Sequence, residues 1–176
     1  MIKVYLANRP PLAEYLNTKV ISHLRAGEIK RIAHETGNHW RKIFNVYAKF
    51  VYCFAEMSHL PLYQQYPSWQ YYRDQSLLQQ GSNTELHLSP SALCLESSVS
   101  DNPKDTVHII MGKLFSERLL ADISVEWLDN DFAINRQYSI IVCPYFDYRQ
   151  LSNIKIERLA ELVGALQTVN HVEVLL

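Results

Sequence analysis

The feature that most constrains the fold is an apolar run at residues 138–142 that stops before Pro144 and leads through a polar loop into a helical pattern at 154–166. A short apolar run of this kind is typical of a strand buried on both faces of a sheet. Residues 106–111 form a second such run, which ends at Gly112. Strands that alternate with helices favour parallel pairing with right-handed crossovers. We therefore predict an α/β fold, a three-layer α/β/α sandwich with a small, mainly parallel central sheet.

Periodicity and turn residues predict the other elements. The clearest helical period lies at 39–57, where apolar residues recur at steps of three and four. That stripe consists of Trp40, Ile43, Phe44, Tyr47, Val51, Phe54 and Ala55. The remaining expected helices lie at 12–21, 26–34, 113–120 and near 71–78, and the remaining expected strands at 2–7, 92–95, 123–127 and 172–175.

Composition limits the class of protein. A chain of 176 residues is most simply one domain covering 1–176, and a net charge of −1 gives no global basic field for nucleic acid or anionic lipid. A local basic face stays compatible with that balance. We expect no membrane span, because no apolar stretch approaches about 18 residues, and no signal peptide at the N-terminus. An odd, sparse set of three cysteines suits a reducing compartment, so we expect a cytoplasmic protein.

The familiar cofactor motifs are absent from the sequence. The seven histidines show no metal-binding spacing with a nearby carboxylate, and no CxxC pair exists. There is also no P-loop, no GxGxxG and no GxSxG. We therefore expect no metal and no cofactor.

The loop after residue 143 is the first candidate site, because ligands of open α/β sheets bind at the carboxyl ends of strands. Asp147 is its candidate catalytic carboxylate; it and Arg149 either contact a ligand or pair with each other. Asn8 and Arg9 follow the first expected strand. The Asn8 amide could orient a water or a polar group of a ligand, although the same residues also suit a simple turn.

The start of the helix at 39–57 is the second candidate. Asn38 is the expected N-cap, and free amides with the positive end of the helix dipole make a natural anion site there. His39, Arg41 and Lys42 add positive or titratable groups. The alternative is a capped helix whose basic residues face solvent.

A segment rich in tyrosine and glutamine lies between residues 63 and 73. Its aromatic rings could stack on nucleic-acid bases, form a contact surface for a protein partner, or pack into the core. The residues of the possible protein contact are Tyr63, Tyr66, Trp69, Tyr71 and Tyr72.

Taken in order, several segments resemble the uracil-DNA glycosylase superfamily, nearest its mismatch-specific uracil or thymine glycosylase branch. That branch has a first strand ending in Gly-Ile-Asn-Pro, and this chain reads Leu-Ala-Asn-Arg-Pro at 6–10. Its Asn-Arg-Phe-Trp-Lys helix start is similar to the sequence Gly-Asn-His-Trp-Arg-Lys-Ile at 37–43. A strand running into Leu-Gly-Lys resembles 109–113. A last strand, a Pro-Ser loop and a final helix resemble 140–165 in position.

The resemblance implies that a base flips into a pocket between the strand ends, with DNA or a nucleobase as the partner. Asn8 would position the attacking water, Tyr145 or Phe146 would stack on the base, and Arg149 and Lys113 would lie on the phosphate side. The full set of implied or candidate ligand-binding residues is Arg9, Asn38, His39, Arg41, Lys113, Tyr145, Phe146 and Arg149.

The chain departs from the family pattern at two places. The first-strand motif lacks its glycine, and residues 143–147 read Cys-Pro-Tyr-Phe-Asp in place of a His-Pro-Ser or Asn-Pro-Ser pattern. Three functions are therefore open. The first is a glycosylase or an inactive descendant that still binds a nucleobase, the second is a protein-interaction module, and the third is a small-molecule enzyme that uses the same strand-end pocket.

Overall fold

The computed structural model describes residues 1–90 and 106–172, including their side chains except at 62, 63 and 168–172. Within these residues seven strands form one sheet in the order β2-β3-β1-β4-β7-β6-β5. The strands are β1 (Ile2–Leu6), β2 (Val20–Ile21), β3 (Thr84–Leu88), β4 (Val107–Met111), β5 (Glu126–Trp127), β6 (Ala133–Asn135) and β7 (Ile140–Cys143). The helices are η1 (Ala13–Tyr15, a 3-10 turn), α1 (Glu28–Thr36), α2 (Asn38–Met57), α3 (Pro61–Gln65), α4 (Trp69–Gln75), α5 (Lys113–Leu119) and α6 (Asn153–Val172).

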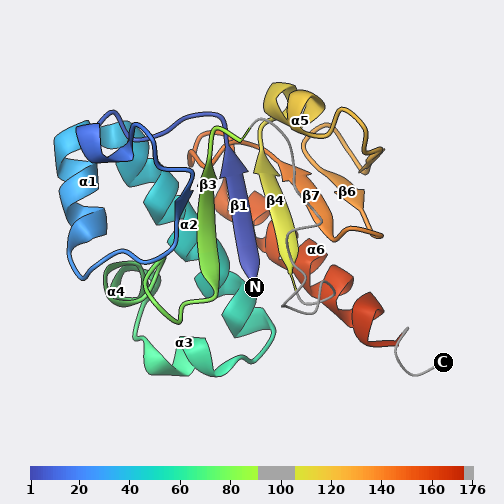
Figure 1. Cartoon of the computed structure of the whole chain (residues 1–176). Helices are drawn as coiled ribbons and strands as arrows, with labels where there is room; N and C mark the ends of the chain where they lie inside the picture. The colour runs from blue at the N-terminus through green and yellow to red at the C-terminus, as the bar shows by residue number, and fades with distance from the viewer. Residues whose placement is uncertain (91–105, 173–176) are drawn as a thin grey trace.

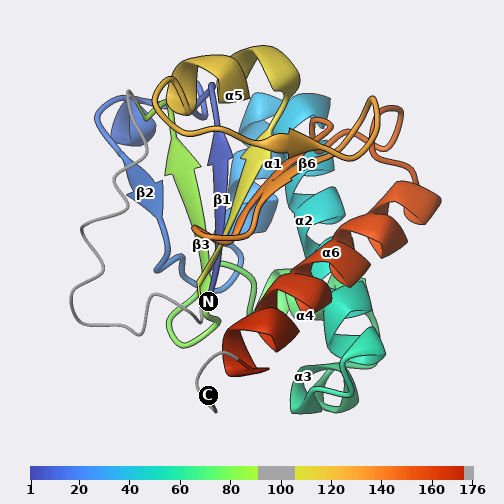
Figure 2. The ribbon, with the colours of Figure 1, turned by 90° about the vertical axis from the view of Figure 1, so that its right-hand side faces the viewer.

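The centre of the sheet is parallel and its edges are antiparallel. β1 pairs in parallel with β3 and β4, and β4 pairs in parallel with β7, whereas β2, β6 and β5 join antiparallel at the two edges. Helices α1, α2, α4 and α6 lie on one side of the strands, whereas α5 lies near the carboxyl end of the sheet and packs through Leu119 against its other face (Figures 1 and 2). The predicted α/β/α sandwich with a mainly parallel centre is confirmed.

Successive side chains of a strand point to opposite faces of the sheet, so the apolar residues pack into two separate cores. In β1, Val4 and Leu6 belong to the large core that includes the apolar sides of α2 and α6. Tyr5 points to the other face and joins the small core that contains Leu119 and Leu120, at the end of α5. Every residue of the apolar stripe predicted for 39–57 is buried, so the strongest sequence pattern is confirmed as the centre of the large core.

Most long elements match their predictions, and the short ones account for the errors. The helix expected at 12–21 is wrong: only η1 forms there, and Val20 and Ile21 pair with β3. These two residues are β-branched, which suits an extended edge strand better than a helix. Strands β2, β3 and β6 and helix α3 were not predicted, and the expected strand at 123–127 is shortened to β5. The strands expected at 92–95 and 172–175 fall outside the described residues, except that Val172 belongs to α6.

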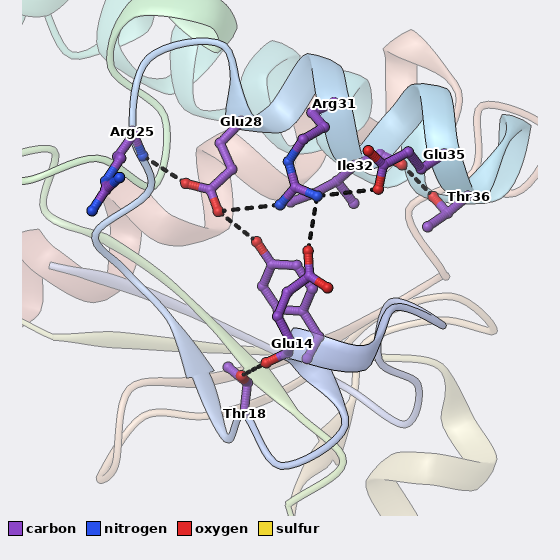
Figure 3. Close-up of polar contacts among 9 residues, drawn as sticks. Glu14, Thr18, Arg25, Glu28, Arg31, Ile32, Glu35 and Thr36 are labelled. Atoms are coloured by element: carbon purple, nitrogen blue, oxygen red, sulfur yellow. Dashed lines mark hydrogen bonds and ion pairs between the residues drawn. The ribbon is translucent and has the colours of Figure 1, made fainter.

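A cluster around Arg31 ties the loop after β1 to α1 (Figure 3). The Arg31 guanidinium lies 2.8 Å from Glu14 of η1 and 3.1 Å from Glu35 of its own helix, and it also pairs with Glu28 at 3.6 Å. The Tyr15 hydroxyl donates to Glu28 at 2.9 Å. The loop that carries Asn8 and Arg9 is thereby anchored just downstream. In the part of the chain that the structure describes, no helix is long and apolar enough to cross a membrane.

Candidate functional site

The carboxyl ends of the parallel strands meet at a point where the chain leaves the sheet in two directions. After β1 the chain runs to α1 and α2 on one face, whereas after β4 it runs directly into α5. Adjacent strands whose connections diverge in this way leave a crevice at their carboxyl ends, the usual ligand position in open α/β folds. The loops after β1 and β7, Ser89 directly after β3 and the start of α2 surround this crevice.

A hollow of about 450 Å³ opens at this point. Its walls come from the loop after β1, the end of α1, the start of α2 and the residue that follows β3. The lining residues are Ala7, Asn8, Arg9, Pro11, Thr36, His39, Trp40 and Ser89. We call it the strand-end hollow. The segments around Asn8 and around His39, which lie far apart in the sequence, thus form one surface.

Tyr145 connects this surface to the loop after β7. Its hydroxyl lies 3.2 Å from Nε2 of His39, and the two rings stack with centroids 5.7 Å apart. Burial raises the pKa of Tyr145, and a hydrogen bond with the Asn8 side chain partly offsets that rise. Asn8, His39 and Tyr145 therefore form one polar and aromatic cluster from three separate elements.

Arg9 and Ser89 complete the rim. The Arg9 guanidinium donates to the Leu16 carbonyl, which closes the loop after β1 and holds the side chain at the edge of the hollow. Ser89 has a φ of 47° and donates from Oγ to the Ala7 carbonyl at 2.6 Å. Sequence reasoning missed Ser89, because β3, the strand that ends next to it, was not predicted.

Asp147 has a different partner from the one expected. Its Oδ2 lies 2.7 Å from Nζ of Lys42 on α2, and its Oδ1 accepts a hydrogen bond from the backbone N–H of Arg149 at 3.0 Å. Lys42 holds the pKa of Asp147 below its usual value, with a smaller contribution from the Arg149 N–H. Lys42 also lies over the Tyr148 ring, 4.9 Å from its centroid. This carboxylate locks the loop onto α2 and does not line the strand-end hollow.

Two residues that were predicted to bind a ligand, Phe146 and Asn38, have other roles in the structure. Phe146 is fully buried and packs against Tyr47 and Phe50, so it is a core residue and cannot stack on a base. Asn38 is not the N-cap of α2: that position is Gly37, and Asn38 is the exposed first residue of the helix with no capping bond from its side chain. Gly37 is both the C-cap of α1 and the N-cap of α2. Its φ of 78° is a backbone conformation that glycine adopts readily.

The basic candidates do not share one pocket. Arg41 lines a separate pocket between α1, α2 and α4, and Lys113 lies over the Trp127 ring, 4.6 Å from its centroid. Arg149 is exposed in the loop after β7. Of the arginine and lysine candidates in the described residues, Arg9 alone lines the strand-end hollow, where it joins His39. The structure therefore divides the predicted phosphate-side residues among several places.

The tyrosine-rich segment is largely folded inward where its side chains are described. Tyr72 is fully buried, Tyr66 packs edge-on against it with centroids 5.5 Å apart, and Trp69 packs against the large core. Tyr71 is the most exposed, at 54%, and the side chain of Tyr63 lies outside the description. The predicted protein contact is reduced to Tyr71 and its immediate surroundings.

Metal and thiol chemistry receive no support from the described residues. They contain no group of three His, Cys, Asp or Glu side chains that could hold a metal ion. Cys143 is a buried free cysteine whose pKa is raised by burial, which disfavours the reactive thiolate. The polar groups that line the hollow are amide, imidazole, hydroxyl and guanidinium groups, and the Tyr145 phenol lies beside His39.

Comparison with known proteins yields one match. The model of a protein family described as "Family of unknown function (DUF6942)" matches residues 1–164. No curated protein and no solved structure matches the chain. Functional inference therefore starts from the geometry of the strand-end hollow.

Proposed function

The chain belongs to the DUF6942 family, and from that premise we propose that it is a divergent uracil-DNA glycosylase-like domain that binds a nucleobase in the strand-end hollow. The partner is a nucleobase within DNA or on its own. The setting we propose is the cytoplasm, with which a buried free thiol at Cys143 is compatible.

The meeting of Asn8, His39 and Tyr145 is the observation that carries this proposal. A carboxamide presents one donor and one acceptor edge, as the Watson–Crick edge of a base requires. The stacked imidazole and phenol offer a planar surface on which a base can continue the stack. Arg9 at the rim supplies a charged donor for a phosphate that follows the base.

The geometry supports binding of the base more strongly than its removal from DNA. A general base works best with a pKa near the operating pH, whereas Lys42 lowers the pKa of Asp147 and holds it away from the hollow. Phe146, the other residue that was expected to stack on a base, is buried in the core. Asn8 remains the residue that could orient a water molecule if base release is retained.

The test is DNA binding measured by fluorescence anisotropy across a salt series. Labelled single-stranded DNA with one uracil, mismatched duplex DNA and fully paired duplex are compared. We expect tighter binding of the uracil and mismatch probes, with a salt dependence from phosphate contacts. Asn8→Ala should weaken binding by about tenfold, since a lost polar contact in a recognition site costs about 1 to 2 kcal/mol.

Asn38→Ala is the matched control, because it removes the same amide from an exposed position that does not line the hollow. It should leave the affinity unchanged. Equal affinity for all three probes, unaffected by Asn8→Ala, would refute the proposed site. Release of free uracil from the probe, lost in Asn8→Ala, would extend the function from binding to catalysis.

A further inference from the structure

A second pocket lies between α1, α2 and α4, away from the strand-end hollow. It has a volume of about 340 Å³, and its apolar floor consists of Ala33, which is half-buried, above the buried side chains of Ile29 and Phe44. Its charged lining groups are Lys30 from α1, Arg41 from α2 and Arg73 from α4, with His34 beside them. None of its lining residues is an aspartate or a glutamate. We call it the three-helix pocket.

Two of these cations are exposed and have no ion-pair partner among the described residues. Neither Lys30 nor Arg41 lies within 4.0 Å of a carboxylate in the described ranges 1–90 and 106–172. Like charges gathered without a counter-ion repel one another, which an anionic ligand would relieve. The pocket thus has an electrostatic reason to bind an anion.

The distribution of charge along α1 sharpens this point. Its carboxylates, Glu28 and Glu35, face Arg31 on the side of the helix that contacts η1 (Figure 3). Lys30 and His34 are one turn apart and lie on the pocket side. The acidic residues of α1 therefore pair with Arg31 on one face, whereas Lys30 and His34 lie on the face toward α2 and α4.

Arg73 is held in a fixed orientation at the base of the pocket. Its Nε and Nη2 donate to the Asp74 carboxylate at 2.7 and 3.0 Å, and its Nη1 donates to Asn45 Oδ1 at 2.6 Å. Three of the five guanidinium N–H groups are occupied in this way. A guanidinium that is already immobilised loses little entropy when its free N–H groups contact an oxyanion.

We propose that the three-helix pocket binds a phosphate group, carried by a free phosphate ester or by a nucleic-acid backbone. Arg41 and Lys30 supply the charge, Arg73 supplies an oriented donor plane, and the apolar floor receives the carbon part of the ester. This site goes beyond the nucleobase proposal and does not depend on it. It uses no residue of the strand-end hollow.

The test is isothermal titration of the full-length chain with inorganic pyrophosphate in low-salt buffer, against a chloride blank. We expect saturable binding, with one site per chain. The double variant Lys30→Gln/Arg41→Gln should weaken it by about tenfold or more, because charge-assisted contacts dominate oxyanion recognition. Arg118→Gln is the control: it removes an exposed arginine from α5, outside the pocket.

The outcomes separate this proposal from the nucleobase proposal. Asn8→Ala should leave pyrophosphate binding intact, so loss of base binding alone does not affect the pocket. A mononucleotide that binds as tightly as a short oligonucleotide would assign the phosphate to a free ester. Tighter oligonucleotide binding that the double variant abolishes would assign it to a nucleic-acid chain. Absence of saturable binding, or an equal loss in Arg118→Gln, would overturn the proposal.

Discussion

Two buried tyrosines allow a direct test of how polar groups are satisfied in this core. Tyr47 and Tyr72 are both fully buried. The Tyr47 hydroxyl lies 3.2 Å from the Ile2 carbonyl and 3.0 Å from the Glu85 carbonyl, so it bridges β1 and β3. Among the described residues the Tyr72 hydroxyl has no hydrogen-bond partner of ordinary geometry. The same substitution should therefore have different effects at the two positions.

The magnitude follows from these contacts. Tyr47→Phe removes a hydrogen bond worth about 1 kcal/mol and leaves buried carbonyls short of a donor, so we expect a loss of about 1 to 2 kcal/mol. Tyr72→Phe removes a hydroxyl that is desolvated without compensation, so the free energy of unfolding should stay within about 0.5 kcal/mol or rise. Burial raises the pKa of Tyr72, and the nearby Thr84 hydroxyl partly offsets that rise. Thr84 already bonds the Leu78 N–H at 3.0 Å and Ser82 at 2.7 Å.

Urea unfolding followed by circular dichroism measures both values. The slope of the unfolding free energy against urea should be the same in the two variants, since neither substitution changes the surface exposed on unfolding. The midpoint should fall only for Tyr47→Phe. Equal losses in both variants, or a larger loss for Tyr72→Phe, would refute the reasoning, because they would show that the Tyr72 hydroxyl has a partner in solution.

Two further predictions concern pH and backbone conformation. Burial, with a smaller effect of Lys3, lowers the pKa of His108 to about 4, so the unfolded chain binds a proton that the folded chain excludes between about pH 6.5 and 4. The free energy of unfolding should therefore fall by about 3 kcal/mol as pH drops through that window, a slope that disappears in His108→Gln and persists in the exposed control His23→Gln. Gly37 has φ 78° and ψ −160°, a region nearly closed to other residues, so Gly37→Ala should cost about 1 to 3 kcal/mol in a thermal or urea melt. Gly164→Ala, inside α6 with open space around the missing Cβ, should not destabilise the chain, and a loss there equal to that of Gly37→Ala would contradict the explanation.

The long elements could be predicted because their patterns are strong and local. The buried stripe of α2 and the apolar runs of β4 and β7 are visible in the sequence at periods of 3.6 residues or as continuous runs. β2 and β6 are two and three residues long, too short to carry any period, and only their pairing with β3 and β7 makes them strands. Their existence depends on tertiary contacts that no local window contains.

The candidate site was predictable in its parts but not in its assembly. Asn8, His39 and Tyr145 stand out as polar or aromatic residues at element ends, and parallel pairing brings such ends to one edge. Asp147 and Phe146 lie beside Tyr145 in sequence, yet one pairs with Lys42 and the other turns into the core. The direction in which a loop side chain points depends on its neighbours in space. The sequence alone therefore could not show that Tyr145, Phe146 and Asp147 point to three different surroundings.

The two proposed sites meet at the first turn of α2, and helix geometry limits what can fill both. His39 lines the strand-end hollow and Arg41 lines the three-helix pocket. Residues two positions apart on an α-helix differ by about 200° in direction, so the two sites lie on opposite sides of a helix about 10 Å wide. A small ligand that fills one site leaves the other open. If both proposed sites bind as argued, a short nucleic-acid strand that passes around the start of α2 would occupy both, and its second contact would gain from effective concentration. If the two sites share the first turn of α2 in this way, uracil and pyrophosphate should bind independently of each other. A strand that carries both a base and a phosphate should then bind much more tightly than either small ligand.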